Sequence, residues 1–531
     1  MILGTAVLAA VMVAHGNLDP DESQHLHVAW LIGQGRVPYA DFWEHHMPLL
    51  PLALAPVTRW FADQPDIFFV ARTIMAVTAA ATLYVVYVLG GRVGPGVGIA
   101  AVALLAVQVR FLQHVIQVRP DAPALLTWLL TVLMLVRWRE ADRERWLWIA
   151  GLALGVTATF TPKAAFLGLG VVAVILVSPS PARTVRRLAC VAVGCAVPLA
   201  VFIAWLAAAG GRRALHALVN DVVVANLRFP DFIKQTAVGG EGVGFVVLAL
   251  VGVAMTVRRL GTRVLRDPVH GPLLIPTAVV SLVLLLPRTP AVYSYTWLPV
   301  LAVGSLYAGL ALVTSIERAR LIAGMRERIV SAVTIIAGIV LPIVVFGVLT
   351  FPRNISNEAD LARMRRELAH ACPGEAVLDA KAFAVFRPTA LRYPSLVRGV
   401  RTWIKQGVIP TRVLIEDLRA ARAPVGVLDS RLRDNEAIAA FIEKYYVREP
   451  DDLLLAGTTI ATREGTTEAE VELLVPGRYE ITMPPGTQVT IDGAVPNSQG
   501  TWLREGAHRV SWRGERGMIR LTITPCAKRR A

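Results

Sequence analysis

Long apolar runs dominate the first two thirds of the chain. Eleven runs of about 15 to 24 residues approach the length that a helix needs to cross about 30 Å of hydrocarbon. They lie near residues 1–15, 67–90, 95–110, 120–137, 147–161, 164–178, 188–209, 242–257, 271–287, 291–313 and 329–350. The first run lacks a basic flank and a small-residue cleavage motif, so we expect a membrane anchor and not a cleavable signal peptide. The pattern predicts an α-helical multi-pass membrane protein with about eleven transmembrane helices.

Beyond residue 350 the apolar segments become short. Helical patterns at residues 358–371, 415–421 and 435–446 alternate with strand-like runs at 376–378, 425–429 and 453–456, which predicts a small α/β domain. From about residue 468, apolar and polar residues alternate between turns, as in β-strands. We therefore expect three domains: a transmembrane domain at 1–350, a soluble α/β domain at 351–465 and a small β domain at 466–531.

Composition separates the same two parts. The chain is 55% hydrophobic and 18% charged, with a net charge of +15. The first 350 residues carry 27 Lys and Arg against 17 Asp and Glu, whereas the last 181 carry 27 against 22. Most of the basic excess is therefore in the apolar part, which is atypical of a nucleic-acid-binding protein.

The basic residues predict the orientation in the membrane. Alternate loops contain sixteen arginines: Arg92, Arg137, Arg139, Arg143, Arg145, Arg183, Arg186, Arg187, Arg258, Arg259, Arg263, Arg266, Arg318, Arg320, Arg326 and Arg328. By the positive-inside rule these loops face the cytoplasm. With eleven spans, the N-terminus is then cytoplasmic, and the soluble part lies outside the bacterial cytoplasmic membrane, where it is periplasmic or extracellular. Eleven of the first seventeen acids fall on or near the outer face, where some are expected to be functional.

The first outer loop, residues 16–66, holds a cluster of acids: Asp19, Asp21 and Glu22. One interpretation is a capped, amphipathic helix on the membrane surface, with Asp19 or Asp21 as the cap. Capping requires only one acid, and three neighbouring carboxylates repel one another. The cluster therefore favours a functional carboxylate.

The same loop contains possible metal ligands. Glu44, His45, His46, His25 and Asp21 have side chains that suit zinc or manganese. Their spacing matches no established metal motif such as H-E-x-x-H. We therefore expect no required cofactor, with a divalent metal at Glu44 and His45 as an open alternative.

The order of motifs resembles that of the GT-C glycosyltransferases, in particular protein O-mannosyltransferases and lipid A aminoarabinose transferases. The acidic pair Asp21-Glu22 follows the first span, and then come Gly35, Pro38-Tyr39, Asp41-Phe42 and Pro48-Leu49. His46-Met47-Pro48 stands where the aminoarabinose enzymes have Lys-Pro-Pro. The resemblance implies a base at Asp21, with Glu22 beside it, and a donor sugar carried on a polyprenyl phosphate.

Further residues resemble substrate-binding positions of that superfamily. They are Arg119, Asp121, Lys163, Arg288 and Tyr295, together with Tyr39 and His46 of the first loop. Lys163 and Arg288 suit a phosphate group. Other interpretations are a helix-start ion pair for Arg119 and Asp121, a snorkelling Lys163, and an interfacial aromatic belt, which we prefer for Trp297.

The predicted function is an inverting glycosyl transfer from a polyprenyl-phosphate sugar to a glycan, lipid or protein acceptor of the cell envelope. Membrane lipids are further partners, and nucleic acid is not. Two alternatives are a lipid-linked polymer ligase, which would rely on Arg and His in a late outer loop, and a transporter, which would show inverted repeats.

The soluble part permits two more predictions. Gly477-x-Tyr479, Ile491-Asp492-Gly493 and Gly506-x-His508 resemble PEGA-like β-domains of envelope proteins, which implies a β-sandwich. Cys372 and Cys526 both lie in this exported part, where a disulfide can form. Cys190 and Cys195 lie within a span and are expected to be packing residues.

Overall fold

The computed structural model describes residues 2–530 apart from 179–180, 225–232, 237–238, 240–241, 322–323, 346–354, 463–466, 498 and 515. The chain forms two compact units. The first comprises Met1–Asn17, His45–Leu54 and Asp66–Asn357, and the second comprises Leu18–Glu44, Ala55–Pro65 and Glu358–Ala531. The two predicted domain boundaries, after residues 350 and 465, lie outside the described residues and remain predictions.

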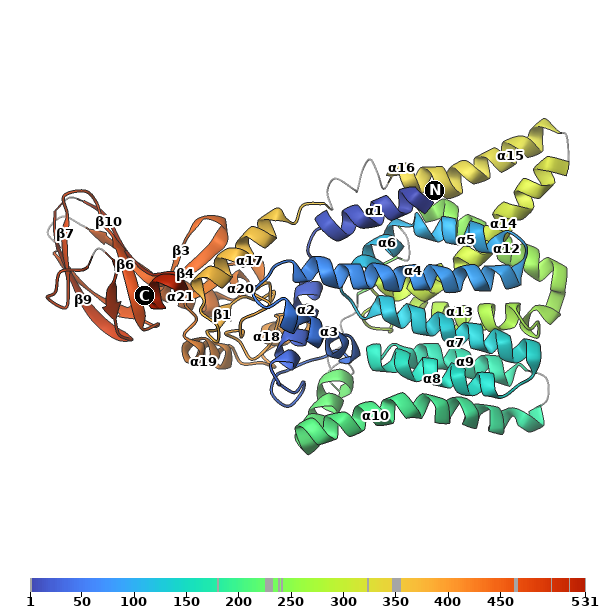
Figure 1. Ribbon diagram of the computed structural model, residues 1–531, viewed down its shortest axis with the longest axis horizontal. Coiled ribbons are helices and arrows are strands. Elements are labelled where there is room, and N and C mark those ends of the chain that lie inside the picture. Colours follow the sequence, from blue (N-terminus) through green and yellow to red (C-terminus); the bar gives the residue numbers. More distant parts are fainter. Residues whose placement is uncertain are drawn as a thin grey trace. The chain divides into compact units, whose positions relative to one another are not determined.

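The first unit is helical. Its helices are α1 (Ile2–His15), α4 (Ile67–Val93), α5 (Val97–Ala106), α6 (Val109–Ile116), α7 (Asp121–Ala141), α8 (Arg145–Phe160), α9 (Ala164–Leu176), α10 (Thr184–Leu218), α12 (Val243–Leu260), α13 (His270–Leu285), α14 (Leu298–Leu321), α15 (Met325–Ile335) and α16 (Leu341–Val345). Helices α4, α7, α8 and α10 run side by side (Figure 1). The helix α3 (Leu49–Trp60) contributes its first residues to this unit and the rest to the second.

Several of these helices suit a membrane span. Five helical segments of the described chain are long and apolar enough: Ile67–Val93, Asp121–Ala141, Thr184–Val224, Val243–Leu265 and Ser294–Arg318. The bent pair α5 and α6, which meet at 78°, would make a sixth. Shorter apolar helices cover the predicted spans at 1–15, 147–161, 164–178 and 271–287. The multi-pass membrane fold is confirmed, whereas the number eleven remains a prediction.

Three loops that we predicted on the cytoplasmic side meet at one end of the first unit. Arg92 pairs with Glu140 at 2.5 Å, which joins the loops at 91–94 and 137–146. Arg186 donates to Glu144 through Nε at 2.8 Å, and Arg187 lies 3.1 Å from Asp142, which adds the loop at 179–187. The arginine-rich loops are therefore neighbours in space, as a single membrane face requires.

Glycines let two helices of this unit approach closely. A Cβ atom on Gly151 of α8 would lie 2.3 Å from the Val191 carbonyl oxygen of α10, and one on Gly155 would lie 2.4 Å from that of Cys195. Small residues at such crossings are typical of packed membrane helices. Cys190 and Cys195 are free thiols on α10 and belong to this packed region.

The second unit contains two sheets. The larger has the order β1-β2-β4-β10-β6-β8, with β3 also paired to β4, and the smaller has the order β5-β9-β7. The strands are β1 (Val377–Leu378), β2 (Val425–Val427), β3 (Tyr446–Arg448), β4 (Leu453–Thr462), β5 (Glu468–Leu473), β6 (Gly477–Thr482), β7 (Gln488–Ile491), β8 (Thr501–Leu503), β9 (Gly506–Arg513) and β10 (Gly517–Ile523). Because β4 pairs with β10, the predicted boundary after residue 465 does not separate two sheets.

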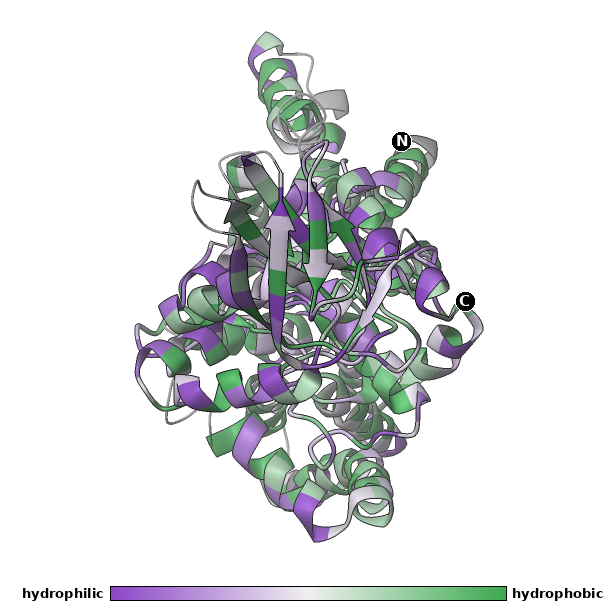
Figure 2. Cartoon of the chain, turned by 90° about the vertical axis from the view of Figure 1, so that its left-hand side faces the viewer, coloured by the Kyte–Doolittle hydropathy of each residue, from purple (hydrophilic) through white to green (hydrophobic). Residues whose placement is uncertain are grey.

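Buried and exposed residues alternate along the strands, and the buried ones form a core that the two sheets share. His508, Val510 and Trp512 of β9 are buried, while the residues between them are exposed or half-buried. Tyr479 and Leu521 of the larger sheet belong to the same hydrophobic cluster as Val510 and Trp512 of the smaller one. Hydrophilic and hydrophobic residues alternate along the strands that face the viewer (Figure 2). The two sheets therefore pack through their apolar faces, as the predicted strand pattern requires.

Helices and one disulfide complete the second unit. The helices are α2 (Pro20–Gly33), α17 (Glu358–His370), α18 (Arg398–Lys405), α19 (Thr411–Ala421), α20 (Ser430–Arg433), α21 (Glu436–Tyr445) and α22 (Cys526–Arg530). Cys372 and Cys526 form a disulfide across 154 residues, which confirms that prediction. Next to it, Arg529 of α22 pairs with Glu375 at 2.5 Å. The end of the chain is thus fixed to the segment that follows α17.

Candidate functional site

The predicted site residues divide between the units. Asp121, Arg119, Lys163, Arg288 and Tyr295 lie in the first unit, together with His45 and His46, and Asp21, Glu22, Tyr39 and Glu44 lie in the second. Each group is therefore described within its own unit, except that Glu44, His45 and His46, which are consecutive in sequence, are described together.

Three helix starts converge in the first unit. Asp121 is the first residue of α7, Lys163 directly precedes α9, and Tyr295 lies in a short 3₁₀ helix (Ser294–Trp297) that leads into α14. The N-terminus of a helix carries partial positive charge and directs backbone N–H groups outward, so it favours anions. The proline before Asp121 and the one before Lys163 suit such starts because proline is tolerated where no helical N–H bond is needed.

Two cations gather around one carboxylate there. Lys163 Nζ lies 3.0 Å from Asp121 Oδ1, and Arg119 Nε lies 3.8 Å from Asp121 Oδ2. The same two cations lie over the Tyr295 ring, at 4.2 Å for Lys163 Nζ and 4.1 Å for Arg119 Cζ from the ring centroid. The structure therefore brings together four of the predicted residues. We call Arg119, Asp121, Lys163 and Tyr295 the cation cluster.

The cation cluster borders a cavity of about 40 Å³. Asp121, Lys163, Tyr295, Thr161 and Thr296 supply its polar lining, and apolar side chains of α7, α9, α13 and α14 complete it. A cavity of this size with several polar neighbours can hold ordered water or a small polar group. Arg288 is exposed on its loop and does not line this cavity.

Residues that the sequence did not single out hold Tyr295 in place. His114 of α6 lies 2.8 Å from Ser294 Oγ through Nε2, and its ring meets the Tyr295 ring edge-on at 5.6 Å. Gln235 accepts from the Ser294 N–H at 2.9 Å through its side chain and from the indole N–H of Trp297 at 3.0 Å through its carbonyl. Trp297 is thus a buried, hydrogen-bonded residue, and its position in an interfacial belt stays a prediction.

In the second unit, Asp19 caps the helix that carries Asp21. Its side chain accepts from the Asp21 N–H at 2.8 Å, and Glu22 Oε2 accepts from the Asp19 N–H at 2.9 Å, which makes a capping box. The Asp19 cap confirms one of the two predicted caps. Glu22 is fully buried, whereas Asp21 is half-buried. The capping box gives Glu22 a structural role and leaves Asp21 as the better candidate base.

Helix α2 is buried and not amphipathic, which corrects the predicted surface helix. Every residue from Glu22 to Ala29 is buried, polar ones included. The Ser23 hydroxyl donates to the Lys381 carbonyl at 2.7 Å, and His27 donates from Nδ1 to the Val385 carbonyl at 2.9 Å. Burial lowers the pKa of His27 to about 4, so the imidazole is neutral near pH 7. The loop at 381–385 therefore supports the helix of Asp21.

A half-buried arginine, Arg431, lies near Asp21. Burial lowers the pKa of the Arg431 guanidinium, and the carboxylates of Asp429, Asp21 and Asp379 oppose that shift. Arg431 donates to the Ala380 carbonyl at 3.2 Å, next to the Lys381 carbonyl that accepts from Ser23. The acidic start of α2 thus faces a positive group of the C-terminal segment.

The Gly-x-x-Pro-Tyr-x-Asp-Phe motif forms a tight turn. Gly35 has a φ of 83° and Tyr39 a φ of 67°, both in the left-handed region. Asp41 Oδ2 accepts from the Val37 N–H at 2.7 Å, and the Tyr39 N–H donates to the Phe42 carbonyl at 3.0 Å. The motif therefore fixes backbone geometry, and Tyr39 is a buried part of this turn. Positive φ at a bulky residue is strained and is often found at functional sites.

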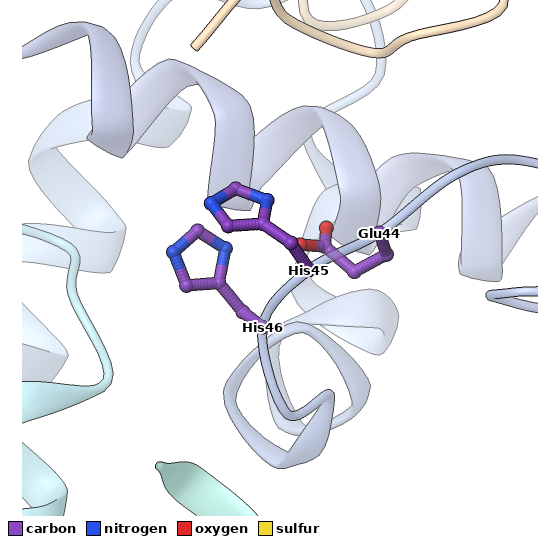
Figure 3. Close-up of side chains that lie close together, drawn as sticks. All are labelled: Glu44, His45 and His46. Atoms are coloured by element: carbon purple, nitrogen blue, oxygen red, sulfur yellow. The ribbon is translucent and has the colours of Figure 1, made fainter. Parts of the chain in front are cut away.

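Glu44, His45 and His46 could hold a metal ion. One ligand atom from each lies within 4.8 Å of the others, and within the described chain this is the only group of three or more potential ligands. The imidazole rings of His45 and His46 lie next to each other, with centroids 3.8 Å apart (Figure 3). The residue types suit zinc, which takes imidazole and carboxylate ligands.

Comparison with solved structures finds proteins that this chain resembles. ArnT from Cupriavidus metallidurans, in a crystal structure bound to undecaprenyl phosphate, matches with a TM-score of 0.56 at 14% identity, over 86% of this chain and 97% of that one. The oligosaccharyltransferase of Archaeoglobus fulgidus, in complex with zinc and sulfate, matches with a TM-score of 0.45 at 14% identity, over 85% and 72%. No curated protein matches the sequence.

A family model also matches part of the chain. Residues 45–207 match the dolichyl-phosphate-mannose-protein mannosyltransferase family. That segment contains Arg119, Asp121 and Lys163 of the cation cluster. The chain thus has the fold of ArnT, and residues 45–207 are similar to a mannosyltransferase family, as the predicted GT-C resemblance requires.

Proposed function

We propose that the protein transfers a sugar from a polyprenyl-phosphate donor to a hydroxyl group of an envelope glycan, lipid or protein, with inversion at the anomeric carbon. The observation that carries the proposal is the cation cluster. Lys163 and Arg119 lie beside Asp121 and Tyr295 where three helix starts converge, which suits a phosphate group. The undecaprenyl phosphate bound to ArnT, a protein of the same fold, supports this assignment.

The reaction requires two kinds of groups. A base takes the proton of the acceptor hydroxyl as its oxygen bonds to the anomeric carbon of the sugar. The bond between that carbon and the phosphate oxygen breaks, and the electron pair remains on the phosphate. Cations stabilise the charge that develops on the leaving phosphate. We assign the base to Asp21 and the cations to Lys163 and Arg119.

The other predicted residues have secondary roles in this proposal. Arg288 and His46 remain candidates for contacts with the donor or the acceptor. The turn that contains Tyr39 would shape the acceptor side. A divalent metal at Glu44, His45 and His46 would supply a positive charge there, and the proposed transfer does not depend on it.

The proposed setting is a bacterial cytoplasmic membrane. The N-terminus lies in the cytoplasm, and the C-terminal segment lies on the outer face. The Cys372–Cys526 disulfide supports this orientation because disulfides persist in oxidising compartments. The clustering of three arginine-rich loops supports it as well.

The test is mass spectrometry of envelope glycans and polyprenyl-phosphate sugars in a strain that lacks the gene. We expect one polyprenyl-phosphate sugar to accumulate and one glycan modification to disappear. Complementation with the natural gene should reverse both changes. Unchanged donor pools together with unchanged envelope glycans would contradict the proposal.

A further inference from the structure

The cation cluster contains an anion of its own. Asp121 places one carboxylate oxygen 3.0 Å from Lys163 and the other 3.8 Å from Arg119. Its side chain is only 10% exposed, so solvent screens this charge weakly. A phosphate that binds Lys163 and Arg119 must therefore do so next to a resident negative charge.

The resident charge acts differently on substrate and product. In the donor, the phosphate is a diester with one negative charge. Transfer breaks its bond to the sugar and leaves a monoester, which carries about −1.5 to −2 charges at pH 7. Repulsion by Asp121 is proportional to the charge of the ligand, so it opposes the product about twice as strongly as the donor.

We propose that Asp121 is a discrimination residue that weakens binding of the polyprenyl-phosphate product relative to its sugar-bearing donor and so promotes product release. The inference rests on the proposed function, because it assumes that Lys163 and Arg119 bind the lipid phosphate. Tyr295 makes the role possible, since its ring contacts both cations and keeps them in place when the carboxylate is removed.

A binding experiment on the full-length protein in lipid nanodiscs tests this role. The probes are undecaprenyl phosphate, which is mainly a dianion at pH 8, and its methyl diester, which has one charge. Asp121→Asn keeps the shape of the side chain and removes the charge. We expect it to bind undecaprenyl phosphate about tenfold more tightly and the methyl diester only about threefold more tightly, because the two effects scale with ligand charge.

Three further variants make the result specific. Asp121→Glu keeps the charge and should retain the natural discrimination between the probes. Asp121→Ser is a second neutral variant, and it replaces Asp121→Asn in the binding experiment if that variant does not fold. Glu140→Gln removes a carboxylate that pairs with Arg92 in a different part of the unit, and it should leave both affinities unchanged.

The outcomes separate the inference from the proposed function. Equal affinities in the natural protein and the neutral variants, equal tightening of both probes, or weaker binding of both would overturn the discrimination role. A natural protein that binds neither probe, or a Lys163→Gln variant that binds both as well as the natural protein does, would overturn the phosphate site itself and the inference with it.

Discussion

Tyr295 is the residue that holds the cation cluster together. Its ring lies about 4 Å from the charged groups of both Lys163 and Arg119. The ring is in turn stacked on Tyr293, with centroids 5.2 Å apart. An aromatic face attracts cations, so the ring orients two groups that would otherwise repel each other.

Replacement of Tyr295 should separate the role of the ring from that of the hydroxyl. Tyr295→Leu removes the aromatic face, and we expect about tenfold weaker binding of undecaprenyl phosphate, which corresponds to about 1.4 kcal/mol. Tyr295→Phe keeps the ring and should retain most of the affinity. The measurement is a titration of the full-length protein with this lipid. Equal affinities of Tyr295→Leu and the natural protein would show that the ring does not support the cations.

Glu367 of α17 is a buried acid in the second unit. Within the described chain, neither of its carboxylate oxygens has a hydrogen-bond partner. Burial, reinforced by nearby Asp379, raises the pKa of this carboxyl well above its usual value. The folded protein therefore holds this proton more tightly than the unfolded chain does, so stability falls as the pH rises above about 4.5.

The variant Glu367→Gln should remove this pH dependence. We expect its apparent unfolding temperature to exceed that of the natural protein by a margin that grows between pH 5 and pH 8. Thermal unfolding at a series of pH values provides the measurement. Glu358→Gln is a matched control on the same helix, where Glu358 is exposed, and it should show no such pH-dependent margin. A difference in unfolding temperature between Glu367→Gln and the natural protein that does not change with pH would contradict the raised pKa of Glu367.

At the scale of the element, the disulfide is expected to stabilise the second unit. It closes a loop of 154 residues, which restricts the unfolded chain. Replacement of both Cys372 and Cys526 by serine should cost about 2 to 5 kcal/mol of stability. Thermal unfolding and mobility on non-reducing gels provide the measurements. The pair Cys190→Ala and Cys195→Ala is the control, and an equal effect of the two pairs would contradict the prediction.

Elements were predictable where local pattern decides them. Most of the apolar runs correspond to helices, and the Asp19 cap follows from the acids before α2. The run at 95–110 instead breaks into α5 and α6, which meet at 78°. A continuous apolar run shows that a segment is buried but not where it bends. Similarly, α2 looked like a surface helix because its partner loop at 381–385 lies more than 350 residues away in sequence.

The site was predictable to the extent that it consists of motifs. All four residues of the cation cluster were chosen by resemblance, and the structure brings them together. His114 was missed because it belongs to no motif and its contact with Ser294 joins residues 180 positions apart. Gln235 was missed for the same reason. Long-range packing decides which polar residues support a site, and one sequence carries no direct signal of it.

At the scale of the whole molecule, the positions of the charged residues are more informative about function than the net charge is. The net charge of +15 could suit many anionic partners. Within the first unit, however, three of the arginine-rich loops share ion pairs, whereas Lys163 and Arg119 surround Asp121 in the cation cluster. In the proposed function, the arginine-rich loops set the orientation in the membrane, and the cation cluster binds the lipid phosphate.

The most direct test of the proposed transfer uses the donor that accumulates in a strain without the gene. Purified protein is mixed with this lipid extract and acceptor membranes from the same strain, and mass spectrometry follows the conversion of polyprenyl-phosphate sugar to polyprenyl phosphate. We predict conversion by the natural protein and by Glu22→Gln, and at least a hundredfold slower conversion by a folded Asp21→Asn variant, since general-base catalysis contributes about 10²- to 10⁴-fold. Absence of conversion by the natural protein, or equal rates with Asp21→Asn, would contradict the account.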